Sequence, residues 1–167
     1  MDAATLRETQ APLKQRYRTD PASARTPLSA AGSISAEGIA CTVEGRAGPV
    51  RAGLHPAAGG DGSDACSGDM LLEALVACAG VTFRSVATSF GVDVGAATVR
   101  ATSTFDVRGT LGVDRAVPVG IGPVEVVVEV EGAVDDETLA KLARTTERYC
   151  VVGQSLTTPP KIVVRRR

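Results

Sequence analysis

The segment SGDMLLEALVACAGVTFRSVATSF (67–90) constrains the fold more than any other part of the sequence. Between Met70 and Val81 it contains one charged residue, Glu73, and one glycine. Its start and end carry the usual helix signals, a serine followed by an early acidic residue and then a glycine just past the end. A helix that is apolar on nearly every face is normally buried. The sequence therefore predicts a helix over 67–90, with Ser67 as N-cap, in the middle of the protein or between two subunits.

Segments with strand character flank this helix. Three short segments before it predict an antiparallel meander: Leu28–Ile34, Ile39–Glu44 and Pro49–Leu54. Three more follow it: Val92–Val107, Val124–Glu131 and Lys161–Val164. Acidic residues from Asp135 onward open a second, amphipathic helix that ends near Cys150. This order predicts an α+β fold in which a mostly antiparallel sheet packs against two main helices.

The length of 167 residues fits one domain, which we expect to span 28–167. Residues 1–27 are predicted to form an appendage that is partly helical over 4–18. Pro12 is expected to interrupt this helix, and Asp20-Pro21 to end it.

The net charge and the hydropathy of the sequence limit the kinds of binding partner and the cellular compartment that we expect. The net charge is −1, from 18 basic and 19 acidic residues, so no basic field is available for nucleic acid or an anionic membrane. The amino-terminal residues lack the apolar core of a secretory signal, and the apolar stretch 70–81 is too short to span a bilayer. We therefore expect a cytoplasmic protein whose four cysteines are thiols, ligands or redox catalysts rather than structural bridges.

Cys78 and Cys150 are the candidate reactive residues. Cys78 lies in the middle of the apolar helix, where burial alone would leave it an inert core residue. Cys150 lies on the inward face at the end of the second helix. Two such helices on one sheet can bring the thiols within disulfide reach, as a two-cysteine peroxidase requires. The spacing leaves both interpretations of Cys78 open.

The remaining cysteines and the single histidine predict little chemistry. Cys41 lies in an expected strand, Cys66 just before the long helix, and His55 in a loop rich in turn residues. Zinc ligands usually occur in close pairs, and the sequence has no C-x-x-C pair. We expect no metal and no cofactor.

Two motifs carry a family resemblance. SGDMLLEALVACAGVTFRSVA (67–87), after a loop containing Gly59-Gly60-Asp61, resembles the central-helix motif of the OsmC/Ohr superfamily. This superfamily comprises the osmotically induced and organic-hydroperoxide-resistance proteins. ERYCVVGQSL (147–156) resembles its second cysteine motif, and the resemblance covers about 28–164.

The resemblance implies an intertwined homodimer with the central helices at its middle. It implies that Cys78 is the peroxidatic thiol, that Cys150 is the resolving thiol, and that organic hydroperoxides are the substrates. The expected reductant is an external dithiol such as a dihydrolipoyl group. Family members also use a Glu and an Arg beside the reactive cysteine. Here Gly68 occupies the Glu position, which makes Asp69 the candidate, and the upstream arginines are Arg25, Arg46 and Arg51.

Two functions remain open at this point. The first is a thiol-dependent peroxidase that acts on alkyl or lipid hydroperoxides in an apolar pocket. The alternative is a redox-sensing or small-ligand-binding protein on the same fold, because a buried thiol without activating groups reacts slowly.

Overall fold

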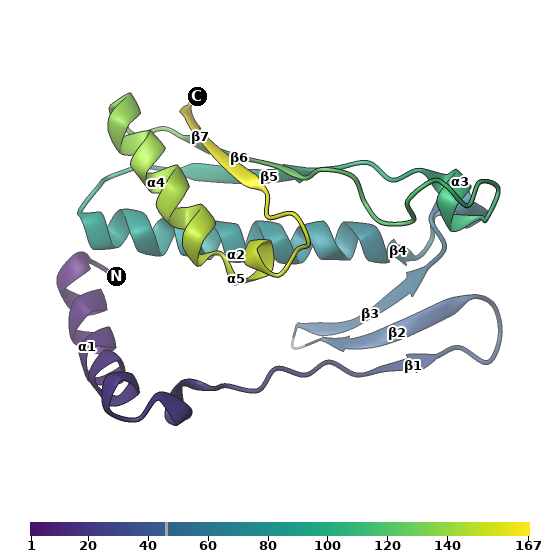
Figure 1. The fold of residues 1–167 in the computed structure, drawn as a ribbon, viewed down its shortest axis with the longest axis horizontal. Helices are drawn as coiled ribbons and strands as arrows, with labels where there is room; N and C mark the ends of the chain where they lie inside the picture. Colours follow the sequence, from purple (N-terminus) through teal and green to yellow (C-terminus); the bar gives the residue numbers. More distant parts are fainter. Residues whose placement is uncertain (46) are drawn as a thin grey trace. The chain divides into compact units, whose positions relative to one another are not determined.

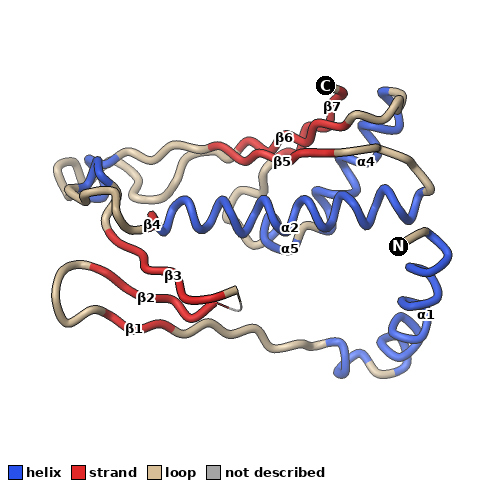
Figure 2. Tube along the Cα trace, turned by 180° about the vertical axis from the view of Figure 1, so that it is seen from behind, coloured by secondary structure: helices blue, strands red, loops and turns tan. Residues whose placement is uncertain are grey.

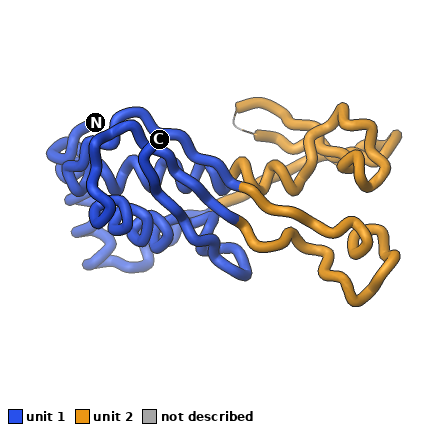
Figure 3. The backbone as a smooth tube through the Cα atoms, turned by 90° about the horizontal axis from the view of Figure 1, so that it is seen from above, with its two compact units in different colours: residues 1–27, 75–101, 125–167 blue, residues 28–74, 102–124 orange. Residues whose placement is uncertain are grey.

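The computed structural model describes residues 1–45 and 47–167. The chain divides into two compact units (Figure 3). Unit 1 comprises residues 1–27, 75–101 and 125–167, and unit 2 comprises residues 28–74 and 102–124. The boundary at Leu75 lies within one long helix. Residues 1–27 group with unit 1, and the expected single domain over 28–167 stays a prediction.

Unit 2 contains a four-stranded sheet in the order β1-β2-β3-β4. Its strands are β1 (Gly32–Ile34), β2 (Ala40–Gly45), β3 (Gly48–Gly53) and β4 (Ala65–Cys66). Strands β1, β2 and β3 form the expected antiparallel meander, with Thr42 opposite Arg51. Strand β4 pairs with β3 in parallel. Two short helical turns, η2 (Pro56–Ala58) and α3 (Val107–Thr110), complete the unit.

Unit 1 contains a three-stranded sheet in the order β5-β6-β7. Its strands are β5 (Ala97–Thr102), β6 (Glu125–Val130) and β7 (Lys161–Arg166). Its helices are α1 (Ala3–Thr19), the short η1 (Pro21–Ala24), most of α2 (Ser67–Phe90), α4 (Asp136–Tyr149) and α5 (Val151–Gln154). Helix α2 runs along one face of the sheet, and α4 lies beside β7 (Figures 1 and 2).

The core of unit 1 follows from two periodicities. Strand β6 buries every second residue, namely Val126, Val128 and Val130. The helices bury residues three or four positions apart, which is the spacing of one helix face. These helical core residues are Leu75, Ala79 and Phe83 on α2 and Leu139, Leu142 and Thr146 on α4. Both helices therefore present one apolar face to the valine-rich sheet.

The bounds predicted for the long helix are confirmed at both ends. Helix α2 ends at Phe90, where Gly91 adopts a left-handed φ of 68° and the Val92 amide bonds to the Ala87 carbonyl. Ser67 is the first helical residue rather than the N-cap, because strand β4 runs directly into the helix. The predicted start of α4 is confirmed: the helix begins at Asp136, and Asp135 is its N-cap, whose carboxylate accepts a hydrogen bond of 2.8 Å from the Thr138 amide.

Three sequence predictions need correction. The strands form two sheets instead of one, and the pairings β3–β4 and β6–β7 are parallel. Helix α1 continues through Pro12, whose missing amide leaves only one exposed turn without its hydrogen bond. Strand β5 ends at Thr102, and its expected continuation to 107 is interrupted before α3, where Asp106 caps the helix.

By length and composition, helix α2 could cross a membrane, with a mean hydropathy of 1.6 over its most apolar 18 residues. Central helices of globular proteins share these properties. Only 28% of that window is buried. Much of the apolar surface of this helix is therefore uncovered in the single chain.

Candidate active site

Cys78 lies on α2 at the border between a buried and an exposed face. Its neighbours Leu75 and Ala79 are fully buried, whereas Val81, three residues further on, is 73% exposed. The Cys78 side chain itself is partly buried. This position gives its sulfur contact with the core of unit 1 on one side and access from outside on the other.

Cys150 lies at the junction of two helices. It is the C-cap of α4 and the N-cap of α5, and its extended backbone (φ −73°, ψ 100°) separates them. Its amide bonds to the Thr146 carbonyl at 2.9 Å, and its sulfur accepts a hydrogen bond from the Gly153 amide at 3.4 Å. The side chain is 1% exposed, which confirms the predicted inward face.

The structure brings the two predicted thiols together in unit 1. The Cys78 sulfur accepts a hydrogen bond of 3.5 Å from the Val152 amide, two residues after Cys150. The Cys150 thiol and the Thr82 hydroxyl are further neighbours of this sulfur that favour its ionised form. Both cysteines are free thiols. Residues 72 positions apart in the sequence therefore form one hydrogen-bonded cluster.

The pKa values of the two thiols are shifted in opposite directions. Burial opposes ionisation of Cys78, but the bonds from the Val152 amide, the Cys150 thiol and the Thr82 hydroxyl outweigh it and lower its pKa below the ordinary thiol value. Burial raises the pKa of Cys150, and the neighbouring Cys78 thiolate adds to this effect. Of the two thiols, Cys78 is therefore the one that ionises at the lower pH.

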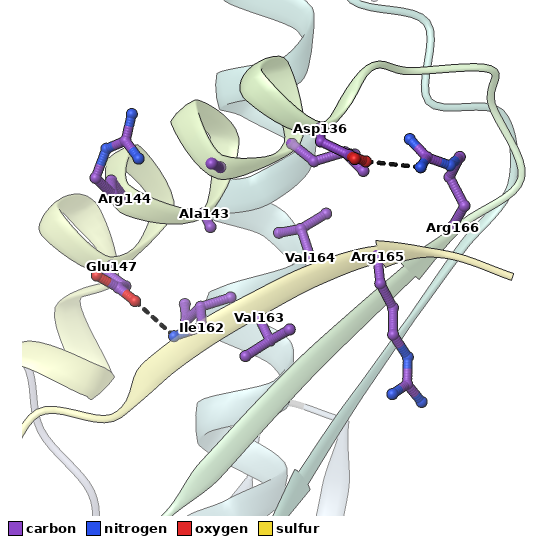
Figure 4. A pocket seen from close by; sticks show the side chains of 11 residues that line it. Asp136, Ala143, Arg144, Glu147, Ile162, Val163, Val164, Arg165 and Arg166 are labelled. Atoms are coloured by element: carbon purple, nitrogen blue, oxygen red, sulfur yellow. Dashed lines mark hydrogen bonds and ion pairs between the residues drawn. The ribbon is translucent and has the colours of Figure 1, made fainter.

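The last turn of α4 is fastened to strand β7. The Glu147 carboxylate accepts a hydrogen bond of 2.7 Å from the Ile162 amide (Figure 4). The Gln154 side chain donates to the Glu147 carbonyl at 2.8 Å. A groove of about 560 Å³ lies between α4 and β7, with an Asp136–Arg166 ion pair at its other end. Glu147 and Gln154 thus hold the junction that carries Cys150.

Asp69 lies in the first turn of α2, in unit 2. It is nine positions before Cys78, which corresponds to about 13 Å along the helix axis. Asp69 lines a cavity of about 310 Å³ within unit 2, together with His55, Cys66 and Phe105. Within one chain it is therefore not beside the Cys78 sulfur, and its position suits the positive end of the helix dipole.

The candidate arginines are dispersed. Arg51 pairs with Asp64 at 2.8 Å in unit 2, and Arg25 is exposed. Arg46 lies outside the described residues. Within unit 1, Arg84 bonds to the Gly95 carbonyl at 2.9 Å. That an arginine activates Cys78 stays a prediction.

Sequence reasoning did not identify two groups that contact the Cys78 sulfur. Thr82 lies four residues after Cys78, and this helical spacing could have identified it. The Val152 amide has no side-chain signature and required the tertiary structure. Across residues 1–45 and 47–167, no three His, Cys, Asp or Glu side chains are arranged to hold a metal ion.

The fold and the thiol cluster define a class of small α+β proteins with a two-cysteine centre. The family model for OsmC-like proteins matches residues 60–165. The chain therefore belongs to the OsmC-like protein family. No curated protein sequence matches it.

Solved structures share the fold at low sequence identity. An OsmC-like protein of unknown function from Vibrio cholerae is 16% identical, with a TM-score of 0.67 over 86% of this chain and 100% of that chain. An organic hydroperoxide resistance protein from Elizabethkingia anophelis is 17% identical, with a TM-score of 0.66 over 86% and 99% of the two chains. An organic hydroperoxide resistance protein from Legionella pneumophila is 12% identical, with a TM-score of 0.61 over 85% and 98%.

Proposed function

We propose that this protein is a thiol-dependent peroxidase that reduces alkyl or lipid hydroperoxides. The observation that carries the proposal is the Cys78–Cys150 cluster, in which the Val152 amide bonds to the Cys78 sulfur and the pKa of Cys78 is lowered while that of Cys150 is raised. A peroxidase of this type needs a nucleophile and a nearby thiol that does not compete for the peroxide. Membership of a family whose fold is shared by organic hydroperoxide resistance proteins supports the same function.

The proposed reaction has three balanced steps. The Cys78 thiolate attacks the peroxide oxygen, the O–O bond breaks, and the alkoxide leaves with a proton as the alcohol, so that Cys78 becomes a sulfenic acid. The Cys150 sulfur then displaces hydroxide from that sulfenic acid, which gives the Cys78–Cys150 disulfide and water. Finally, an external dithiol, such as a dihydrolipoyl group, reduces the disulfide by exchange and is itself oxidised to a disulfide.

An apolar side chain near Cys78 supports an organic substrate. Val81, one helical turn after Cys78 on α2, is 73% exposed. Its side chain adds apolar surface on the exposed side of Cys78, which an alkyl chain can cover and hydrogen peroxide cannot. The proposal therefore includes faster reduction of an alkyl hydroperoxide than of hydrogen peroxide.

The proposal includes a homodimer formed over α2, in the cytoplasm. Ala74, Ala77 and Val81 share one exposed face of this helix at spacings of three and four residues. Small side chains on such a face allow two helices to approach closely. A second copy would cover apolar surface that the single chain leaves in water.

Peroxide consumption by single cysteine variants tests the function. Turnover of an alkyl hydroperoxide with a dithiol reductant should be lost in Cys78→Ser. Cys150→Ser should still consume about one equivalent but fail to turn over. Cys66→Ser is the matched control, because Cys66 is a free, partly buried thiol outside the pair. Unchanged consumption by Cys78→Ser would contradict the proposal.

A second candidate is a redox sensor on the same fold, the alternative that the sequence left open. The bonds to the Cys78 sulfur come from amide, thiol and hydroxyl groups, which carry no positive charge. Such donors favour the thiolate less than a guanidinium does. Mass spectrometry during peroxide treatment distinguishes the two functions, since a sensor forms the disulfide once and does not turn over.

A further inference from the structure

The two sulfurs bind consecutive main-chain amides of one short segment. The Val152 amide donates to Cys78 at 3.5 Å, and the next amide, that of Gly153, donates to Cys150 at 3.4 Å. The Val151 amide, one residue earlier, makes a smaller contribution that also lowers the pKa of Cys78. These three residues begin α5, where amides have no acceptor within the helix and are free to bind other groups.

The segment is held in place by contacts outside the thiol cluster. Gln154, its last helical residue, bonds to the Glu147 carbonyl, and the Ser155 hydroxyl bonds to the Val151 carbonyl at 2.8 Å. A Cβ atom at Gly153 would lie 3.3 Å from the Cys150 sulfur and 3.6 Å from Leu75 Cδ1. The amides are therefore fixed against the sulfurs by packing and by bonds at both ends.

We propose that the main-chain amides of Val151 and Val152 hold the Cys78 sulfur as the reactive thiolate, so that the segment carrying the resolving cysteine also activates the attacking one. This inference rests on the proposed peroxidase function and names the activating groups of that site. Hydrogen bonds from fixed amides stabilise a developing or full negative charge without any reorganisation. Activation and resolution of Cys78 then depend on the same α4–α5 junction.

Val151→Pro removes one of these donors with little steric change. Val151 is the first residue of α5, where proline is well tolerated, and Cys150 has the extended backbone that a residue before proline requires. Val151→Ala is the matched control, because it keeps the amide and trims a side chain that is 65% exposed. The two variants differ chiefly in the presence of the N–H group.

The readout is the pH profile of Cys78 alkylation by iodoacetamide, followed by mass spectrometry of the Cys78 peptide. On the acidic side of the profile, Val151→Pro should react about two- to tenfold more slowly than the parent, since one neutral hydrogen bond is lost. The midpoint of the pH profile should move to higher pH in Val151→Pro. The profile of Val151→Ala should match that of the parent protein. Coincident profiles for Val151→Pro and the parent would overturn the inference, as would equal shifts in both variants.

A semisynthetic chain keeps the test decisive if the proline variant does not fold. Ligation of residues 1–149 to a peptide of residues 150–167 at Cys150 allows an ester to replace the Val152 amide. The ester should slow Cys78 alkylation as the proline does, relative to an all-amide ligation product, and an unchanged rate would overturn the inference. Alkylation needs no peroxide. If the substitution shifts the alkylation profile but the protein does not turn over peroxide, only the proposed function is contradicted. If the protein turns over peroxide but the profile does not shift, only this inference is contradicted.

Discussion

At the scale of single residues, the Cys78 sulfur depends on several modest contacts. Burial raises the free energy of the thiolate, and three kinds of neutral donor lower it by more. Cys150 is more deeply buried, and the neighbouring Cys78 raises its pKa, whereas Cys150 lowers that of Cys78. Small differences in burial and in donor number therefore give two adjacent thiols opposite tendencies.

The opposite pKa shifts of Cys78 and Cys150 predict the order in which iodoacetamide labels them as the pH is raised. The pKa of Cys78 is lowered, so its thiolate forms at a lower pH than that of an ordinary thiol, whereas Cys150 ionises at a higher pH. As the pH is raised, iodoacetamide should therefore modify Cys78 before free glutathione and Cys150 after it. Peptide mass spectrometry at short reaction times measures both. Earlier labelling of Cys150 than of Cys78 would contradict this assignment.

At the scale of elements, the end of α4 determines where Cys150 lies. The Glu147 carboxylate bonds to the first buried amide of β7, that of Ile162, and so joins the helix to the edge of the sheet. The α4–α5 junction follows within three residues. Any loosening of this attachment is transmitted to the resolving thiol.

Substitution of Glu147 tests this attachment. Glu147→Ala should lower the free energy of unfolding by about 1–2 kcal/mol, because it leaves the partly buried Ile162 amide without its acceptor. It should also slow formation of the Cys78–Cys150 disulfide. Glu147→Gln is the matched control, since its carbonyl oxygen can still accept the bond. Urea denaturation and timed thiol trapping measure the two effects, and equal losses in both variants would argue against the bond.

Elements with strong local signals could be predicted from sequence. The bounds of α2 followed from the helix signals at Ser67 and Asp69, the apolar stretch 70–81 and Gly91 just past the end, and the start of α4 from the acidic residues at Asp135. The parallel pairings β3–β4 and β6–β7 join distant segments, and the two residues of β4 are too few to show a period. The two cysteines were identifiable as side chains, whereas the Val152 amide belongs to the main chain that every residue shares.

At the scale of the whole molecule, the uncovered face of α2 predicts self-association. Val81→Glu places a charge on that face and should shift the protein from dimer to monomer, because a buried unpaired carboxylate is strongly unfavourable in an interface. Val113→Glu is the matched control, since Val113 in unit 2 has the same exposed fraction of 73% as Val81. Sedimentation velocity measures the result. A monomeric parent protein, or equal behaviour of both variants, would exclude the α2 face as the interface.

With the homodimer that we propose, the border position of Cys78 makes its chemistry depend on protein concentration. Its sulfur lies between the core of unit 1 and the helix face that carries Val81. Whatever covers that face also changes the water around the thiol, and with it the balance between thiolate and thiol. A dilution series would then change reactivity per molecule, so that rates measured at nanomolar and at micromolar protein need not describe the same catalyst.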